Sequence, residues 1–361
     1  MTTRAFASLA LLVAACSSTG AEGVGDRNLP TAAMGPFRKL AAEEVRGIAP
    51  FVFDDRVALY REPAALAEGD DTILYAVARA EGRDVIVRTR ASDGRSFFGT
   101  TGDFGKVPPV VLAPDAAWEG DALSGPFVVR ASGELLLYYA AAGGIGLARS
   151  TDGLVFRKEP APILTRDPAS AWETTEVRAP SVYVLPDGRV RLLYASGGSI
   201  GEAESADGVS FRRVDPVPST PAIEPVLAPA PPAPPGSLLP NEKPPFDTAS
   251  VGDPCVVLRT TPVGRLHVRV LYTGADASGA SAIGFAARYG DAGPLSRQPS
   301  PVYSVGAHEA APAVVERSDG TFLYVHQDRR VDERLTYTAI AAAFSPATIK
   351  LPLPADFPER P

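Results

Sequence analysis

One plan of short strands recurs five times along the chain. Its clearest copy spans residues 125–156, where a Gly-Pro pair is followed by three segments of alternating apolar residues with turns at Ser132-Gly133 and Thr151-Asp152-Gly153. Alternation with a period of two, bounded by turn residues, indicates half-buried β-strands. Three or four such strands form a small antiparallel sheet that cannot bury both faces alone, so the copies must stack on one another.

The other copies open in the same way, with a small residue or Asp before a proline and an apolar strand after it. The five prolines are Pro50, Pro126, Pro180, Pro254 and Pro312. Their spacing is too irregular for a thin solenoid, but it suits propeller blades of roughly 50 residues with loop insertions on one face. The sequence therefore predicts an all-β fold, a five-bladed β-propeller of antiparallel four-stranded blades.

The N-terminus has a separate role. Residues 1–15 contain one positive charge and an apolar run that is too short to span a bilayer, so we interpret them as a signal peptide. The small residues that end at Cys16 resemble the lipobox of bacterial lipoproteins, in which the Cys becomes the lipidated first residue. We therefore expect residues 16–35 to be a lipidated tether, and the protein to be exported and held to a membrane of the bacterial cell envelope through this lipid only. The alternative is a plain signal peptide with an incidental cysteine.

Composition limits the other options. The chain has 33 Gly and 36 Pro, which favour turns over long helices, and its best helix candidate, residues 37–46, lies outside the blades. The formal net charge of -7 argues against nucleic acid as a partner. If Cys16 carries lipid, only Cys255 remains, so the mature chain cannot form an internal disulfide.

Residues 216–245 are crowded with proline and are expected to be extended. They could link two domains. However, residues 225–227 resemble residues 109–112 of the first copy, as though the outer strand of a blade ended there. We therefore favour a long loop over the propeller face, within a single propeller of residues 36–361.

Carboxylates precede several of the predicted first strands. In a propeller these strands line the central channel, so the loops before them meet at one mouth of the channel. The acids in these loops are Glu119, Asp121, Glu173, Glu176, Asp247, Asp253 and Glu309, and Arg178 and His308 occupy similar places. Such a ring suits carbohydrate, because paired carboxylates serve as acid and base while polar groups hold hydroxyls.

The signature IGxAxSxDGxxF, at residues 145–156 and 200–211, resembles the five-bladed propeller glycosidases, which include arabinanases, xylosidases, invertases and levansucrases. The resemblance covers roughly residues 45 to 350. Members of that group use an Asp as base or nucleophile, a second Asp that tunes the proton donor, and a Glu as general acid. Residues 252–254 match the group's Asp-Pro element, and residues 309–312 and 175–180 are looser matches to its Glu-x-Pro element.

The resemblance and the loop positions together make Asp253, Glu176, Asp121 and Glu309 the candidate catalytic residues. Arg178 and His308 are candidate substrate-binding residues, and His308 also resembles a histidine that some members place near a channel metal ion. The group's first-blade Asp would be expected beside Pro50, where this chain has Ala49. The usual catalytic triad is therefore expected to be incomplete.

Two tryptophans leave an alternative open. Glu119 and Glu173 each follow a Trp, in AWEGDALSGP and AWETTEVRAP. Trp118 and Trp172 are either a repeated blade-packing device or a platform that faces the sugar. By contrast, the acids of the Asp-Gly turns, Asp152 among them, are expected to be structural.

Two functions from different classes follow. The first is a surface-attached glycosidase-like protein that hydrolyses or binds a polysaccharide at the channel mouth. The second is a non-catalytic propeller lipoprotein that binds a glycan or an envelope protein there. No cofactor is expected, although a channel calcium ion is left open. The sequence contains no nucleophilic serine motif, phosphate-binding glycine loop or zinc-ligand spacing.

Overall fold

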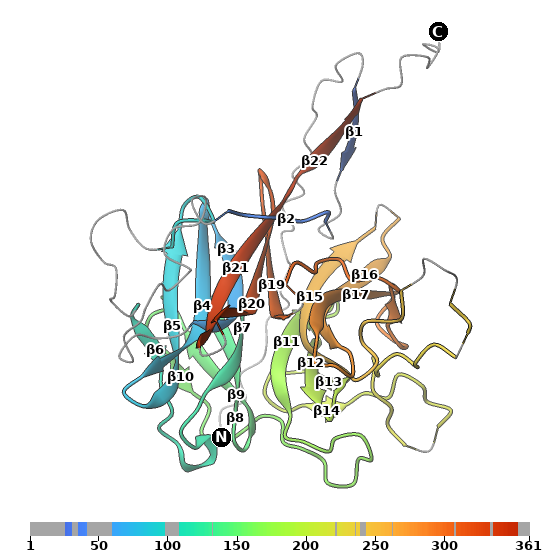
Figure 1. The fold of residues 1–361 in the computed structure, drawn as a ribbon. Helices are drawn as coiled ribbons and strands as arrows, with labels where there is room; N and C mark the ends of the chain where they lie inside the picture. The colour runs from blue at the N-terminus through green and yellow to red at the C-terminus, as the bar shows by residue number, and fades with distance from the viewer. Residues whose placement is uncertain are drawn as a thin grey trace.

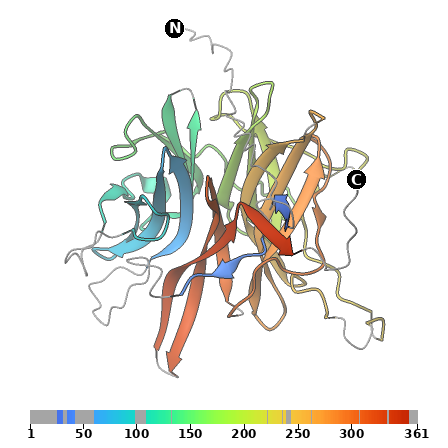
Figure 2. The same cartoon turned by 90° about the horizontal axis from the view of Figure 1, so that it is seen from above.

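The computed structural model describes residues 26–30, 35–41, 60–97 and 108–352, except for short gaps at 132, 221, 235, 239–242, 262, 307 and 333–334. Five four-stranded antiparallel sheets stand around a common axis (Figures 1 and 2), which confirms the predicted five-bladed propeller. Among the described residues, no helix has the length and apolar character needed to cross a bilayer.

Each blade runs from an inner strand at the axis to a short outer strand. Blade 1 is β3 (Arg61–Glu68), β4 (Asp71–Ala80), β5 (Arg83–Ala91) and β6 (Val110–Leu112). Blade 2 is β7 (Ser124–Ala131), β8 (Glu134–Ala141), β9 (Gly144–Ser150) and β10 (Arg157–Lys158). Blade 3 is β11 (Arg178–Val184), β12 (Val190–Ser196), β13 (Ser199–Ser205) and β14 (Arg212–Arg213). Blade 4 is β15 (Ser250–Thr260), β16 (Leu266–Ala275), β17 (Ser281–Tyr289) and β18 (Ser296–Arg297).

Blade 5 joins the two ends of the chain. Its strands β19 (Glu309–Arg317), β20 (Gly320–Asp332) and β21 (Leu335–Pro346) are completed by β2 (Arg38–Lys39) from the N-terminal side. The ring is therefore closed by an N-terminal strand added to blade 5. This corrects the helix expected at residues 37–46, since its first residues form β2; residues 42–46 lie outside the described part.

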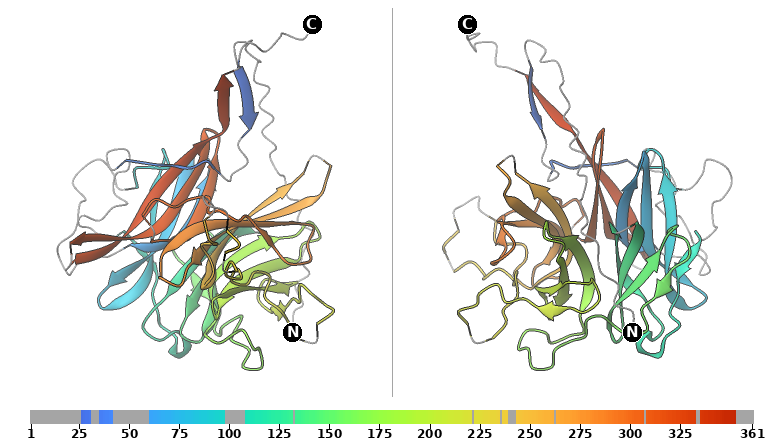
Figure 3. Two further views of the ribbon diagram at one scale, coloured as in Figure 1. Left: turned by 45° about the vertical axis from the view of Figure 1, so that its right-hand side comes forward. Right: turned by 180° about the vertical axis from the view of Figure 1, so that it is seen from behind.

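The ends of the chain meet a second time beyond the propeller. Strand β1 (Asp26–Pro30) pairs with β22 (Thr348–Pro352) in a two-stranded ribbon that projects from the body (Figures 1 and 3). Strand β22 begins at Thr348, two residues after Pro346. Pro346 pairs with Gly320, and this pair lies at the end of blade 5 that is distant from Glu309. The ribbon thus leaves the propeller at the end opposite to the starts of the inner strands.

Every inner strand is interrupted by a bulge at a residue that precedes proline. The residue before the proline has φ between 45° and 52° in all five blades, and the pairing register shifts there. The five pairs, which we call the X-Pro ring, are Glu62-Pro63, Gly125-Pro126, Ala179-Pro180, Asp253-Pro254 and Ala311-Pro312. A left-handed backbone conformation costs on the order of 1–3 kcal/mol at each non-glycine residue. The surrounding packing must therefore hold these residues in that conformation in every blade.

One pair of the X-Pro ring differs from the sequence prediction. The first blade opens with Glu62-Pro63, whereas Ala49-Pro50 was expected; Ala49 and Pro50 lie outside the described residues. The other four prolines stand where they were predicted.

The apolar core is divided into five clusters, one between each pair of neighbouring blades. Representative buried residues of these clusters are Tyr75 with Leu137, Tyr138 with Leu192, Leu193 with Val270, Leu271 with Leu323, and Tyr324 with Leu74. Each sheet thus buries both faces only through its two neighbours, as the repeat predicted.

The start of the proline-rich segment belongs to blade 3. Leu227 forms a two-way backbone hydrogen-bonded bridge with Ile200 of β13, and Val226 accepts a backbone hydrogen bond from Leu295 of blade 4. Leu112 pairs with Ile86 in the same way in blade 1. Both Val226 and Leu227 are buried between blades 3 and 4.

Candidate functional site

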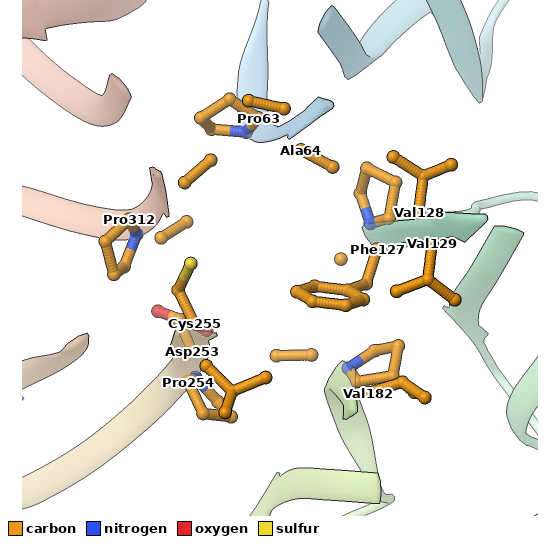
Figure 4. A pocket seen from close by; sticks show the side chains of 18 of the residues that line it. Pro63, Ala64, Phe127, Val128, Val129, Val182, Asp253, Pro254, Cys255 and Pro312 are labelled. Atoms are coloured by element: carbon orange, nitrogen blue, oxygen red, sulfur yellow. The ribbon is translucent and has the colours of Figure 1, made fainter. Parts of the chain in front are cut away.

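A cavity of about 470 Å³ follows the axis of the propeller, and all five inner strands line it. Figure 4 shows a ring of side chains with Pro63, Pro254 and Pro312 around the opening and the ring of Phe127 extending toward the middle. Most lining side chains are apolar. A largely apolar cavity with a few convergent polar groups is the usual form of a small-ligand site.

Three charged residues of the cavity lie at the level of the X-Pro ring, in blades 1, 3 and 4; we call Glu62, Arg178 and Asp253 the mouth triad. The Oε2 atom of Glu62 accepts a hydrogen bond of 2.6 Å from the amide of Gly125 in the next blade. Arg178 Nη1 donates to Asp253 Oδ1 at 3.0 Å, also across a blade boundary. The side chains of Glu62 and Asp253 are 27% and 19% exposed, so both can still be reached from solvent.

The bulge explains why Glu62 and Asp253 line the cavity. An inner strand without it would alternate between the two blade faces, and an acid placed there would enter an apolar core. The left-handed residue instead turns its side chain to the mouth and along the ring. Gly125 shows how close the blades come at this level, because an added Cβ would lie 2.9 Å from the Cα of Ala179.

Glu62 is the acid that sequence reasoning missed. The first blade was expected to lack an acid beside its proline, and this expectation is wrong because Glu62 precedes Pro63. A signal was present in the sequence, since Glu62-Pro63 is followed by the apolar residues 64–66. Asp253, in contrast, stands at the mouth as its match to the Asp-Pro element implied.

The other predicted catalytic acids do not line the cavity. Asp121 and Glu176 are exposed in the loops before β7 and β11, and Glu176 Oε1 lies 3.7 Å from Arg166 Nε. Glu309 is fully buried, and its Oε1 accepts hydrogen bonds from the amides of Val305 and Gly306 and from the Gln327 side chain. Glu309 therefore holds the loop before β19, away from solvent.

The two tryptophans pack inside blades. The rings of Trp118 and Tyr139 stack with centroids 6.0 Å apart, and Tyr139 donates a 2.7 Å hydrogen bond to Glu119. Lys158 of the outer strand completes the group at 2.7 Å from Glu119. Burial acts to raise the pKa of Glu119, but the Lys158 ammonium and two loop amides outweigh it and hold that pKa below its usual value.

The same group recurs in blades 3 and 4. In blade 3, Trp172 stacks on Tyr194, and Glu173 accepts hydrogen bonds from Tyr194 and Arg213. In blade 4 the positions are taken by Phe246, Tyr272, Asp247 and Arg297. The geometry therefore favours the blade-packing interpretation of Trp118 and Trp172, neither of which lines the cavity.

The remaining predicted groups are separate from the cavity. His308 is exposed beside the start of β19 and does not line the cavity. In the described part of the chain, no three His, Cys, Asp or Glu residues are grouped so that they could hold a metal ion. Cys16 lies outside the described residues.

No family model and no curated protein sequence matches the chain. Solved structures do match in three dimensions. A putative glycoside hydrolase from Bacteroides ovatus is 14% identical with a TM-score of 0.62, over 85% of this chain and 96% of that one.

Two further solved structures match this chain over nearly all of their own length. A β-1,2-mannobiose phosphorylase from Listeria innocua is 14% identical with a TM-score of 0.57, over 86% of this chain and 97% of that one. A thermostable family-43 glycoside hydrolase is 15% identical with a TM-score of 0.55, over 87% of this chain and 93% of that one. At such identity the likeness concerns the fold: this chain has the five-bladed propeller architecture found in solved glycoside hydrolases and a mannoside phosphorylase.

Proposed function

We propose that the protein binds one end of a glycan at the X-Pro ring and hydrolyses a glycosidic bond there, with Glu62 and Asp253 as the two carboxylates. One observation carries the proposal: the repeated bulge brings acids from blades 1 and 4 to the mouth of a single cavity. The shared architecture with solved carbohydrate-active enzymes supports it.

The two carboxylates suit different roles. Glycoside hydrolysis needs one ionised carboxylate, as nucleophile or base, and one carboxylic acid that protonates the leaving oxygen. Asp253 pairs with Arg178 at 3.0 Å, and we assign it the role of nucleophile or base. Glu62 is less tightly paired, because Arg61 lies 3.5 Å from it and is shared with Asp84 at 2.6 Å. We therefore assign proton donation to Glu62.

The test is release of reducing sugar or of an aryl leaving group from a panel of arabinosides, xylosides, fructosides and mannosides. We expect Asp253→Asn and Glu62→Gln to lower turnover about 10²–10⁴-fold, the usual worth of a general acid or base. Asp121→Asn is the matched control, since Asp121 is exposed and outside the cavity. Full activity in both mouth variants would refute the assignment.

A second candidate is glycan binding without turnover. It is favoured by the hydrogen bonds that both carboxylates already accept, from the Gly125 amide and from Arg178, because such fixed acceptors suit sugar hydroxyls. Folded protein that binds glycans on an array, is weakened by Asp253→Asn and releases no product would establish this candidate over the first.

We also propose that Cys16 carries the lipid that anchors the protein. The β1–β22 ribbon supports an orientation, since it leaves the propeller opposite the mouth triad and its tip begins ten residues after Cys16. The mouth would then face away from the membrane. Incorporation of labelled palmitate should be lost in Cys16→Ser and kept in Cys255→Ser; equal labelling of both variants would contradict the anchor.

A further inference from the structure

Below the mouth triad the cavity continues between apolar side chains, and we call this part the shaft. Its half-buried apolar lining side chains are Ala65, Phe127, Val129, Val184, Val256, Leu258 and Val314. They come from all five blades, so the apolar surface surrounds the axis. Glycan hydroxyls would find few partners at this depth.

Charged side chains of the cavity stand at its two ends. The mouth triad occupies one end, and Arg130, which pairs with Glu68, is at the other. Tyr183 also lines the cavity, but its hydroxyl already has partners, because it donates to Glu202 at 2.6 Å and accepts from Arg288 at 2.8 Å.

The backbone of the inner strands also offers fewer polar groups than a free sheet edge. Each of the five prolines lacks an N–H group. Three amides near the ring are satisfied by the neighbouring blade: Gly125 by Glu62, Val256 by the Ser181 hydroxyl at 2.9 Å, and Ala311 by the Thr273 hydroxyl at 2.9 Å. These three amides at the mouth therefore have partners within the protein.

Cys255 adds a further apolar group to the lining. It is 5% exposed and also packs in the cluster between blades 4 and 5, where burial raises its pKa to about 12.

The cavity is large enough for a chain to enter it. From Pro254 to Leu258 the inner strand rises roughly 13 Å at about 3.3 Å per residue. The volume of about 470 Å³ exceeds the roughly 150 Å³ of an apolar cavity that binds benzene. The apolar lining along this length suits a straight chain of methylene groups better than the hydroxyls of a second sugar.

We propose that the shaft binds a straight alkyl or acyl chain carried by the glycan whose sugar occupies the mouth. The substrate class is therefore an alkylated or acylated glycan. The sugar part of this proposal rests on the proposed function, whereas the alkyl part does not. The sugar would contact Glu62, Arg178 and Asp253, and the chain would pass Phe127 and enter the shaft.

The test separates the chain from the sugar. Binding of 1-butanol, 1-hexanol and 1-octanol to the full protein is measured by calorimetry, with no glycan present. Because each buried methylene is worth about 0.8 kcal/mol, affinity should rise about fourfold per added methylene until the shaft is full. Val314→Thr, which places a hydroxyl in the shaft at nearly constant shape, should weaken 1-octanol several-fold.

Val263→Thr is the matched control, because Val263 is 82% exposed and outside the cavity. Affinity that does not depend on chain length, or equal affinity in the two threonine variants, would overturn the proposal. Alcohol binding without glycan turnover would support the alkyl-chain site and refute the hydrolase activity. Glycan turnover without alcohol binding would support the hydrolase activity and refute the alkyl-chain site.

Discussion

Neighbouring blades are joined by different kinds of buried polar contact. We compare the junction between blades 2 and 3 with the junction between blades 3 and 4. At the first, the buried hydroxyl of Tyr138 donates to the carbonyl of Gly208 at 3.2 Å, in a neutral contact. At the second, Arg288 Nη2 donates to Glu202 Oε1 at 2.6 Å, and both side chains are at most 5% exposed. A neutral hydrogen bond is thus replaced by a buried ion pair.

The difference follows from the turn that each blade offers to its neighbour. Tyr75 and Tyr324 repeat the contact of Tyr138, donating to Gly153 and Gly94, and each accepting glycine belongs to an Asp-Gly turn. Blade 4 has no Asp-Gly turn after β17, and blade 3 has Leu193 where blade 2 has Tyr138. Without either partner, charged groups fill the space.

Breaking the ion pair should give the largest effect. Arg288→Met removes the closer of two cationic partners and leaves the buried Glu202 with Arg191 at 3.4 Å and the Tyr183 hydroxyl at 2.6 Å. We therefore expect a loss of about 3 kcal/mol in the free energy of unfolding, the lower end of the cost of breaking a buried pair. Urea unfolding measures it. Arg212→Met is the control, because Arg212 is 82% exposed and its pair with Glu204 should be worth at most about 1 kcal/mol. Similar losses of unfolding free energy in the two variants would show that the burial of an ion pair does not determine how much its removal destabilises the protein.

The neutral junction should be less costly to break. Tyr138→Phe removes one buried hydrogen bond to Gly208 and little volume, so we expect about 1 kcal/mol of destabilisation. The same urea titration applies, with Tyr289→Phe as a control because the Tyr289 side chain is 54% exposed. A loss as large as that of Arg288→Met would contradict the comparison.

Acid should weaken the neutral junction through its Asp-Gly turn. Burial acts to raise the pKa of Asp207, but hydrogen bonds from Ser210, Ser205 and Val209 outweigh it and lower that pKa to about 2. The unfolded value is about 3.9, so this stabilisation is complete above that pH and is lost as pH falls toward 2.

The Asp207 contribution is the smallest of the three, under about 1 kcal/mol, because the carboxylate is exposed and screened. Unfolding of the wild type and of Asp207→Asn at pH 7 and pH 3 checks it: the gap between the two proteins should narrow at pH 3. A gap that is constant with pH would show that the turn does not depend on the charge.

The candidate site could be predicted only in part. Asp253 was found because Asp-Pro before an apolar strand is a local pattern. Glu62 was missed because two prolines, Pro50 and Pro63, could open the first blade, and only the pairing of Arg61 with Val77 decides between them. Glu309 was expected in the loop before the last inner strand, but it begins β19, and its burial depends on Gln327 of the next strand.

Sequence by itself determined the blades, since period-two alternation and Asp-Gly turns act within a few residues and a small sheet must stack to bury both faces. The tertiary structure decided which residues meet at the axis. Ring closure by β2, the ion pair of Glu202 with Arg288, and the pairing of Asp253 with Arg178 all join segments distant in the chain. Such contacts depend on how sheets are placed around the ring, and no local pattern carries that information.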